Sequence, residues 1–214
     1  MAGAPGRPGF ELTLAEGVPV WVRPVVPSDR EGLRQGYREM SRTSRYMRFF
    51  TAGAEISAER ARYFTEVDQR DHVAWCAVEP VSNLRGYGIA RFVRDTGQPD
   101  RADFAIALID EMQGKGLGTI LLAALYLLAQ ARGICELRSE VLPDNPILPR
   151  WLPTLGASIT SSGDPSYRLL RWPIRRGNDP PADTPAGHRF AGWLVRLRPL
   201  VGGQNDPTAR PDSD

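Results

Sequence analysis

Cysteine, histidine and lysine are the residue types of which this sequence has least. Its 214 residues include two cysteines, two histidines and a single lysine, so nearly all of the positive charge is arginine. Cys76 and Cys135 lie far apart and have neither metal-ligand nor redox spacing. Both stand in apolar, strand-like segments, so we expect buried free thiols, no metal site and a reducing cytoplasm as the location.

Long apolar runs and a strong charge of one sign are also missing. The first ten residues hold no apolar core of a signal peptide, and the longest apolar run, residues 117–129, is too short to span a bilayer. The net charge is +2, and no basic stripe with interleaved aromatic residues is present. We therefore expect no membrane span and no nucleic-acid partner, and we interpret the apolar run as a buried helix.

Composition divides the chain into one domain and two tails. Residues 1–16 are expected to be a flexible arm, residues 17–174 a folded domain, and residues 175–214 a proline-rich, largely disordered tail. Within this tail, residues 188–198 have apolar side chains at the spacing of one helix face. Packing of this amphipathic segment on its own domain is favoured, while docking on a partner protein or a membrane surface stays open.

Hydrophobic periodicity predicts an α/β domain whose mixed sheet has helices on its faces. Helices are expected from Ser28, from Ser57 and over residues 117–132, each after a turn or capping signal. Strands are expected at residues 18–25, 72–79, 86–95, 102–110, 134–142, 157–162 and 167–174. This gives a twisted, mostly antiparallel sheet of six to seven strands.

A glycine-rich stretch, QGKGLG at residues 113–118, lies between an expected strand and the buried helix. A Walker A loop needs a lysine followed by serine or threonine, and the single lysine here precedes a glycine. A dinucleotide fingerprint needs G-x-G-x-x-G at the first turn of a βαβ unit, and the spacing here is G-x-G-x-G. The pattern Q-x-x-G-x-G remains, and it fits at each specified position.

The chemistry of this pattern follows from the start of a helix. First-turn N–H groups lack intrahelical acceptors and carry the positive end of the helix dipole, and glycines let a pyrophosphate approach the backbone closely. A glycine-rich turn without a ligand is the alternative. The candidate pyrophosphate-binding residues are Gln113, Gly114, Lys115, Gly116, Leu117, Gly118 and Thr119.

In this order and context the stretch resembles motif A of the GNAT family of acyl-CoA-dependent N-acetyltransferases. The resemblance covers residues 17–173, because VRPVVPSDREGL looks like the family's first strand and helix and NPILPRWLPTLGA falls on its motif B. Residues 41–51 and 67–78 resemble the branch that includes bacterial protein-lysine acetyltransferases. The resemblance implies the GNAT fold, with acetyl-CoA as acyl donor.

The same resemblance assigns roles to the strand before the loop. Its backbone is expected to pair with the pantetheine arm of acetyl-CoA at Ile106, Ala107 and Leu108. A backbone N–H near Leu108 would then face the thioester carbonyl and stabilise the oxyanion that forms when an amine attacks. Their side chains are those that any core strand needs, so the proposed role belongs to the backbone.

An amine must also lose a proton before it can attack a thioester. A lysine-type amine has a pKa near 10.4 and arrives charged, so a carboxylate in the site is expected to accept the proton. Related protein acetyltransferases commonly have a glutamate ten residues before the motif's glutamine, and Asp103 stands there. We expect Asp103 to be the catalytic base, acting through water; a solvated aspartate at a strand start is the alternative.

Motif B departs from the family pattern. Asn145 and Gly156 have the usual separation, and the resemblance implies that Asn145 contacts acetyl-CoA. The family often has a tyrosine here that reprotonates the leaving thiolate, whereas this register offers Trp151 and Leu152. Three prolines between residues 146 and 153 predict a short or irregular helix. The identity of the general acid, and full activity, are therefore in doubt.

These observations favour an N-acetyltransferase that moves an acetyl group from acetyl-CoA to a primary amine by direct transfer in a ternary complex. The branch resemblance points to a protein lysine as acceptor. Two alternatives stay open: acetylation of a small-molecule amine, and an acyl-CoA-binding regulatory protein that has lost turnover. The sequence leaves open whether the chain is a monomer or a homodimer.

Overall fold

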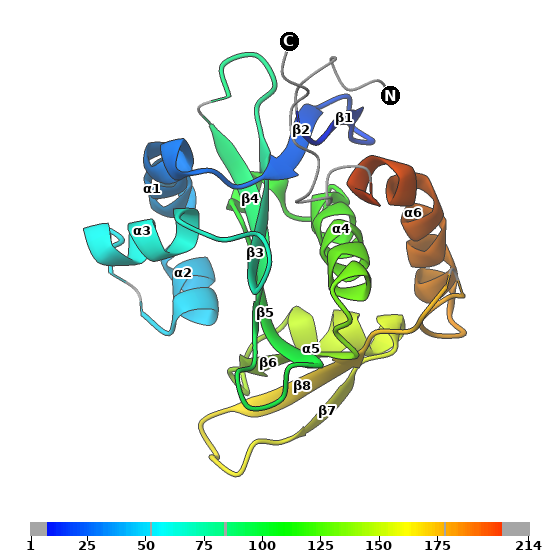
Figure 1. The fold of residues 1–214 in the computed structure, drawn as a ribbon. Helices are drawn as coiled ribbons and strands as arrows, with labels where there is room; N and C mark the ends of the chain where they lie inside the picture. The colour runs from blue at the N-terminus through cyan, green and yellow to red at the C-terminus, as the bar shows by residue number, and fades with distance from the viewer. Residues whose placement is uncertain (1–7, 52, 84, 178, 203–214) are drawn as a thin grey trace.

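One eight-stranded sheet forms the centre of the protein, in a computed structural model that describes residues 8–51, 53–83, 85–177 and 179–202 (Figure 1). The strand order is β1-β2-β3-β4-β5-β6-β8-β7. All neighbours pair antiparallel except β5 and β6, which are parallel. The strands are β1 (Phe10–Thr13), β2 (Pro19–Pro24), β3 (His72–Val78), β4 (Gly86–Arg94), β5 (Arg101–Leu108), β6 (Glu136–Val141), β7 (Ser158–Ser161) and β8 (Arg168–Pro173).

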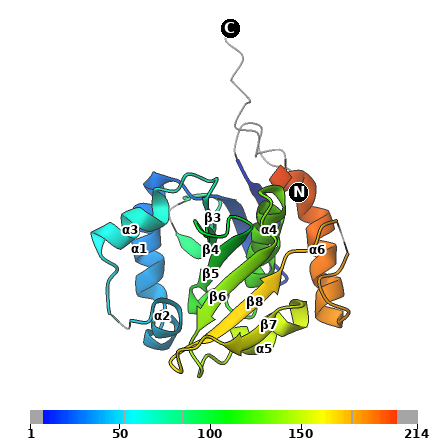
Figure 2. The ribbon, with the colours of Figure 1, turned by 60° about the horizontal axis from the view of Figure 1, so that its bottom comes forward.

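Helices cover both faces of this sheet. Figures 1 and 2 show α1, α2 and α3 on one side and α4 and α6 on the other, with α5 beside β7 and β8. The helices are α1 (Arg30–Glu39), α2 (Arg42–Phe49), α3 (Ala58–Thr65), α4 (Leu117–Ala131), α5 (Leu148–Trp151) and α6 (Pro185–Gly202). The mixed architecture agrees with the expected fold class, and the buried helix was predicted to within one residue at its C-terminal end.

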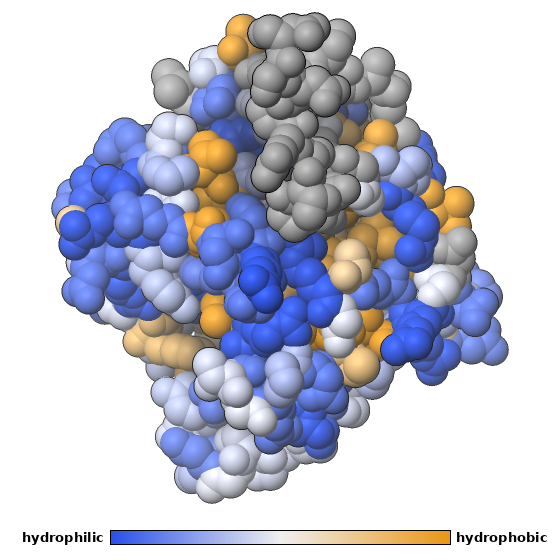
Figure 3. All heavy atoms as spheres, in the orientation of Figure 1, coloured by the Kyte–Doolittle hydropathy of each residue, from blue (hydrophilic) through white to orange (hydrophobic). Residues whose placement is uncertain are grey.

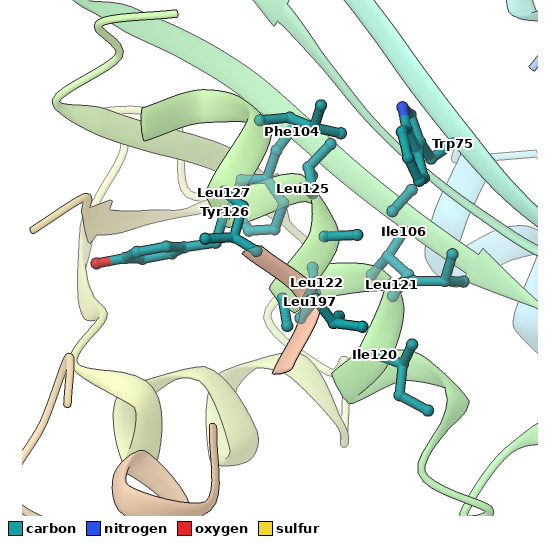
Figure 4. Close-up of a cluster of buried hydrophobic side chains, with 14 of the residues drawn as sticks. Trp75, Phe104, Ile106, Ile120, Leu121, Leu122, Leu125, Tyr126, Leu127 and Leu197 are labelled. Carbon is teal, nitrogen blue, oxygen red and sulfur yellow. The ribbon is translucent and has the colours of Figure 1, made fainter. Parts of the chain in front are cut away.

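The largest apolar core lies between α4 and the sheet. Residues 120–129 of α4 are all buried, so this helix is apolar on every side because the sheet covers one face and α6 the other. Figure 4 shows Trp75, Phe104 and Ile106 of the strands facing the α4 side chains. No helix within the described residues has the length and apolar character needed to cross a bilayer.

The favoured packing of the amphipathic segment on its own domain agrees with the structure, but the expectation of a largely disordered tail was wrong for residues 185–202. They form α6, which extends the amphipathic segment of residues 188–198 at both ends and packs on α4. Phe190, Leu194 and Leu197 are fully buried, and the Phe190 ring lies 5.8 Å from that of Tyr126. The composition was misleading because apolar residues on one face are enough to stabilise a helix when a neighbouring helix packs against that face. Residues 203–214 lie outside the described part of the chain.

Two further expectations need correction. Part of the supposed N-terminal arm, residues 10–13, forms β1, because Phe10 and Leu12 point into the core while the backbone pairs with β2. This strand raises the count to eight; residues 1–7 lie outside the described residues. Cys76 is buried as expected, whereas Cys135 is exposed, because it lies in the turn that leads from Gly133 into β6.

Candidate functional site

The glycine-rich stretch forms the loop that leads into α4. Gly114 and Gly116 have φ values of +75° and +85°, in the left-handed region that favours glycine. Gly116 is also the N-cap residue of α4, without a side-chain cap. A Cβ atom at either glycine would meet no atom within 4 Å, so the space above the loop is open. The loop is therefore open beside both glycines, at the start of a buried helix, where backbone amides can bind an anion.

The side chain of Gln113 fastens this loop to the start of α2. Its Nε2 atom donates to Ser44 Oγ and to Asp110 Oδ1, each at 3.3 Å. The same Asp110 oxygen accepts the backbone N–H of Ser41, the N-cap residue of α2. Partial burial alone would raise the pKa of Asp110, but hydrogen bonds from Ser41 and Ser44 lower it. Gln113 thus has a structural role in the loop.

Lys115 lies at the edge of the loop rather than over it. Its Nζ atom is 2.7 Å from Glu16 Oε2, in the turn between β1 and β2, and this hydrogen bond raises the pKa of the lysine. Leu117 is fully buried, so only its backbone is available to a ligand, and Thr119 is half-buried. The atoms that the loop offers to a pyrophosphate are therefore mainly backbone amides.

β5 separates from β6 immediately upstream of the loop. The two strands pair only over Arg101–Asp103 with Glu136–Arg138, whereas β5 pairs with β4 as far as Leu108. Beyond Asp103 one backbone edge of β5 is therefore not paired with β6. The side chain of Ile106 packs in the core below α4, and Ala107 and Leu108 line a cavity on the α1 side.

This cavity has a volume of about 310 Å³ and lies between α1 and strands β3, β4 and β5. Its lining is mostly apolar and includes Tyr37, Phe49 and Cys76 in addition to the β5 residues. Close packing keeps α1 on the sheet, because a Cβ atom on Gly36 would lie 3.2 Å from a backbone oxygen of β4. The cavity reaches the end of β5 at Ala107 and Leu108.

Asp103 lies on the same face of the sheet as the cavity. It is paired across β4 and β5 with Val93, and its side chain is exposed. Partial desolvation and the nearby carboxylate of Asp95 raise its pKa, while Arg138 opposes this shift. Ala107 is four residues further along the strand, about 13 Å at ~3.3 Å per residue. An amine at the end of β5 can exchange a proton with Asp103 only through water.

The segment after β6 is as irregular as its prolines predicted. The α-helical part, α5, has only four residues and continues as a short 3₁₀ turn at residues 152–155. The side-chain oxygen of Asn145 accepts the backbone N–H groups of Ile147 and Leu148, at 3.0 and 3.1 Å, and so holds the start of α5. This capping role is the one that the structure gives to Asn145; its contact with acetyl-CoA stays a prediction.

Trp151 fills the space where the family motif often has a tyrosine. A Cβ atom added to Gly118 would lie 3.3 Å from the indole Cη2 atom and 3.6 Å from Leu108 Cδ1. The indole ring therefore packs against the start of α4, next to the end of β5. The sequence placed Trp151 at this position in motif B but gave no sign of its contact with Gly118.

His72 and Cys76 are titratable side chains on β3, the strand next to β4. Burial and the charge of Arg91 lower the pKa of His72 to about 4, so this imidazole is neutral and a weak base near pH 7. Burial raises the pKa of the Cys76 thiol to about 12, so it stays protonated. The Cys76 thiol therefore lacks the ionised form that a nucleophile needs, and the His72 imidazole is a base no stronger than an ordinary carboxylate.

Comparison with known proteins agrees with this geometry. Residues 20–158 match the Acetyltransferase (GNAT) domain family. Acetyltransferase Pat of Mycolicibacterium smegmatis is 33% identical over 141 residues, which are 64% of this chain and 40% of that protein. The chain thus spans less than half of the length of this relative.

Solved structures show the same fold. The GNAT domain of S. lividans PAT superposes with a TM-score of 0.72 at 27% identity, covering 80% of this chain and all of that domain. A phosphinothricin acetyltransferase from Sinorhizobium meliloti, in complex with AcCoA, superposes with a TM-score of 0.59 at 19% identity, over 74% of this chain and 90% of that one. The chain belongs to the GNAT acetyltransferase family.

Proposed function

We propose that this protein transfers an acetyl group from acetyl-CoA to a primary amine, and that the amine is a lysine side chain of a protein. One observation carries the proposal: two left-handed glycines, with open space above them, stand at the first turn of a buried helix in a chain of the GNAT family. This loop offers a pyrophosphate several backbone amides, as an acyl-CoA ligand requires.

The strand before the loop supplies the reacting geometry. Because β6 turns away from β5 after Asp103, the backbone of Ile106–Leu108 can pair with the pantetheine arm. An amide near Leu108 would donate to the thioester oxygen as negative charge develops there. An amine that enters from the cavity attacks the carbonyl carbon, and Asp103 takes up its proton through water. The tetrahedral intermediate then breaks its C–S bond, and CoA leaves as a thiolate that takes a proton from water.

Direct transfer in a ternary complex is the route that the side chains support. A covalent route needs a nucleophile with an accessible ionised form near the thioester. The thiol of Cys76 lines the cavity but stays protonated, and the exposed Cys135 lies at the other end of the sheet, before β6. The attacking group is therefore the acceptor amine itself.

A protein lysine is proposed as acceptor because residues 41–51 and 67–78 resemble the protein-acetylating branch. A small-molecule amine is the second candidate, since the cavity of about 310 Å³ has room for one. We place the activity in the cytoplasm, and the chain acts as a monomer or a homodimer.

The test measures CoA-thiol release from acetyl-CoA with two sets of acceptors: lysine-containing peptides and free amino acids. Calorimetry with acetyl-CoA, run in parallel, separates binding from turnover. Peptide-dependent thiol release supports the proposal, while release with free amino acids alone assigns the small-molecule function. Tight acetyl-CoA binding without acceptor-dependent release identifies an acyl-CoA-binding protein and refutes the enzyme.

A further inference from the structure

Three arginine side chains from separate elements meet around two phenylalanine rings on the α1–α3 side of the sheet. Arg48 comes from α2, Arg60 from α3 and Arg91 from β4. The guanidinium carbon of Arg48 lies 4.8 Å from the ring centre of Phe49, and that of Arg91 lies 4.3 Å from the ring centre of Phe64. Arg60 is 5.8 and 6.0 Å from the same two rings. We call these three residues the arginine cluster.

The arginine cluster has no carboxylate partner within the described residues. Arg94, which lies on the same strand as Arg91, pairs with Asp71 at 2.7 Å, but no ion pair forms at the cluster itself. The Nε atom of Arg48 is buried and makes no hydrogen bond. Burial, together with repulsion from Arg91 and Arg60, lowers the pKa of Arg48 to about 9. A bound anion would relieve this repulsion.

Two side chains beside the cluster, His72 and Tyr63, carry no negative charge, while the carboxylate of Asp68 accepts the His72 backbone N–H. His72 lies beside Arg91, with its Nε2 atom 3.5 Å from the guanidinium, and is uncharged near pH 7 because its pKa is about 4. Tyr63 stacks on His72 and faces the Arg91 guanidinium at 5.0 Å. Arg60 is exposed, so the cluster opens to solvent on that side. In Figure 3 the surface over α1–α3 is mostly hydrophilic.

The strand register places this charge beside the proposed reaction. Arg91 pairs with Ala105, which lies midway between Asp103 and Ala107 on the same face of β5. Asp103 and Ala107 are each two residues from Ala105, so the Cα atom of each lies on the order of 8 Å from the Cα atom of Arg91. The Phe49 ring, which lies near the guanidinium groups of Arg48 and Arg60, also lines the cavity that reaches Ala107. Phe49 thus contacts both the cluster and the cavity, although none of the three arginines lines the cavity itself.

We propose that the arginine cluster binds a carboxylate of the acceptor and thereby selects amines that carry an acidic group nearby. This inference rests on the proposed acetyl transfer. Guanidinium groups match carboxylates in shape and form charge-assisted hydrogen bonds, which are stronger where water is partly excluded. The carboxylate belongs either to an aspartate or glutamate next to the target lysine of a protein, or to a free amino acid.

The kinetic test uses acceptor pairs that differ only in charge. One pair is a lysine peptide flanked by glutamates and the same peptide flanked by glutamines; the other is L-lysine and L-lysinamide. We expect kcat/KM to favour the carboxylate member of at least one pair about tenfold, as one or two charge-assisted hydrogen bonds allow. Whichever pair shows the preference identifies the source of the carboxylate.

The variants are Arg48→Gln, Arg91→Gln and Arg60→Gln, with Arg42→Gln as control. Arg42 is exposed on α2 outside the cluster, so its variant removes the same charge without touching the cluster. In the cluster variants the preference for the carboxylate-bearing acceptor should fall below about threefold, whereas the Arg42→Gln control should show the same preference as the wild type. Arg60 is exposed, so its variant should fold even if the others do not. A preference that survives in all the cluster variants, or that is missing in the wild type, overturns the inference.

A binding measurement keeps the inference testable if no acceptor is turned over. Calorimetry with glutarate, at matched ionic strength in chloride, detects carboxylate binding without any chemistry. Glutarate should bind to the wild type and to the Arg42→Gln variant, and at least tenfold more weakly to Arg48→Gln. Equal binding to Arg48→Gln, or no binding to the wild type, contradicts the cluster's role. Glutarate binding without turnover of any acceptor would refute the proposed acetyl transfer but not carboxylate binding by the cluster.

Discussion

Replacing Asp103 by asparagine removes the proposed catalytic base while keeping the shape of its side chain. Asp103 and the end of β5 are about 13 Å apart along the strand, so the proton has to cross a chain of water molecules. General base catalysis contributes 10²–10⁴-fold, and a water relay belongs at the lower end of that range. We therefore expect kcat at pH 7.4 to fall about 10²-fold in Asp103→Asn, with the affinity for acetyl-CoA unchanged.

The pH dependence of this loss tests the assignment more sharply than its size. Without a base, only the neutral amine reacts, and a lysine-type amine with a pKa near 10.4 is neutral in about one molecule in a thousand at pH 7.4. That fraction rises tenfold with each pH unit. The rate of Asp103→Asn should rise in parallel, so that its deficit shrinks to a few-fold near pH 9.4.

Stopped-flow detection of the CoA thiol from pH 6.5 to 9.5 measures both profiles, with Asp100→Asn as control for an exposed aspartate that precedes the same strand. The pKa of Asp103 is higher in the folded than in the unfolded protein. Ionised Asp103 therefore lowers the free energy of unfolding at pH values above its folded-state pKa. This destabilisation is absent below its unfolded-state pKa, which is near 3.9. Asp103→Asn should therefore unfold no more easily than the wild type at pH 7. A deficit that is constant across pH, or no deficit, would refute the base assignment.

Four other substitutions test the loop and the fold. Gly116→Ala forces alanine to a φ of +85°, which costs about 1–2 kcal/mol of conformational strain, and calorimetry should show acetyl-CoA binding weakened about tenfold. Lys115→Ala should change this affinity less than threefold, because the ion pair of Lys115 is at the surface. A larger effect of Lys115→Ala than of Gly116→Ala would contradict binding through the backbone amides of the loop. Phe190→Ala should lower the free energy of unfolding in urea by about 3–5 kcal/mol, and a loss below 1 kcal/mol would mean that α6 does not pack as described. Asp29→Ala leaves the buried Arg23 guanidinium without its 2.5 Å ion pair and should cost about 3 kcal/mol in the same assay; an unchanged urea midpoint would show that the pair contributes nothing.

Local patterns predicted most of the fold, including the glycine-rich turn that precedes α4. The limits of α4 followed from an uninterrupted apolar run that begins after a glycine, because both signals lie within the segment itself. The irregular α5 followed from its prolines in the same way. The left-handed Gly114 and Gly116 agree with the expectation that these positions need unusual dihedrals. Each of these features is determined by neighbours in the sequence.

Features that depend on distant partners were beyond the sequence. For residues 185–202 the pattern predicted the amphipathic segment but not the full length of α6, because the helix is stabilised against α4, a surface that the sequence pattern does not display. The arginine cluster draws one residue each from α2, α3 and β4, so no spacing in the chain connects them. The exposure of Cys135 likewise depends on the turn before β6 rather than on the apolarity of its neighbours.

The contacts of the loop side chains explain why its glycines matter more than its lysine. Gln113 is engaged by Ser44 and Asp110, and Lys115 by Glu16, so both side chains hold the loop to the protein. Because these contacts fix the backbone from both sides, the amides of the first turn of α4 are oriented before any ligand arrives, and less ordering is needed on binding. The link from Gln113 to Ser44 also joins the proposed acetyl-CoA loop to α2, the helix that carries Arg48. The proposed pyrophosphate loop and the proposed carboxylate site are thus connected through α2.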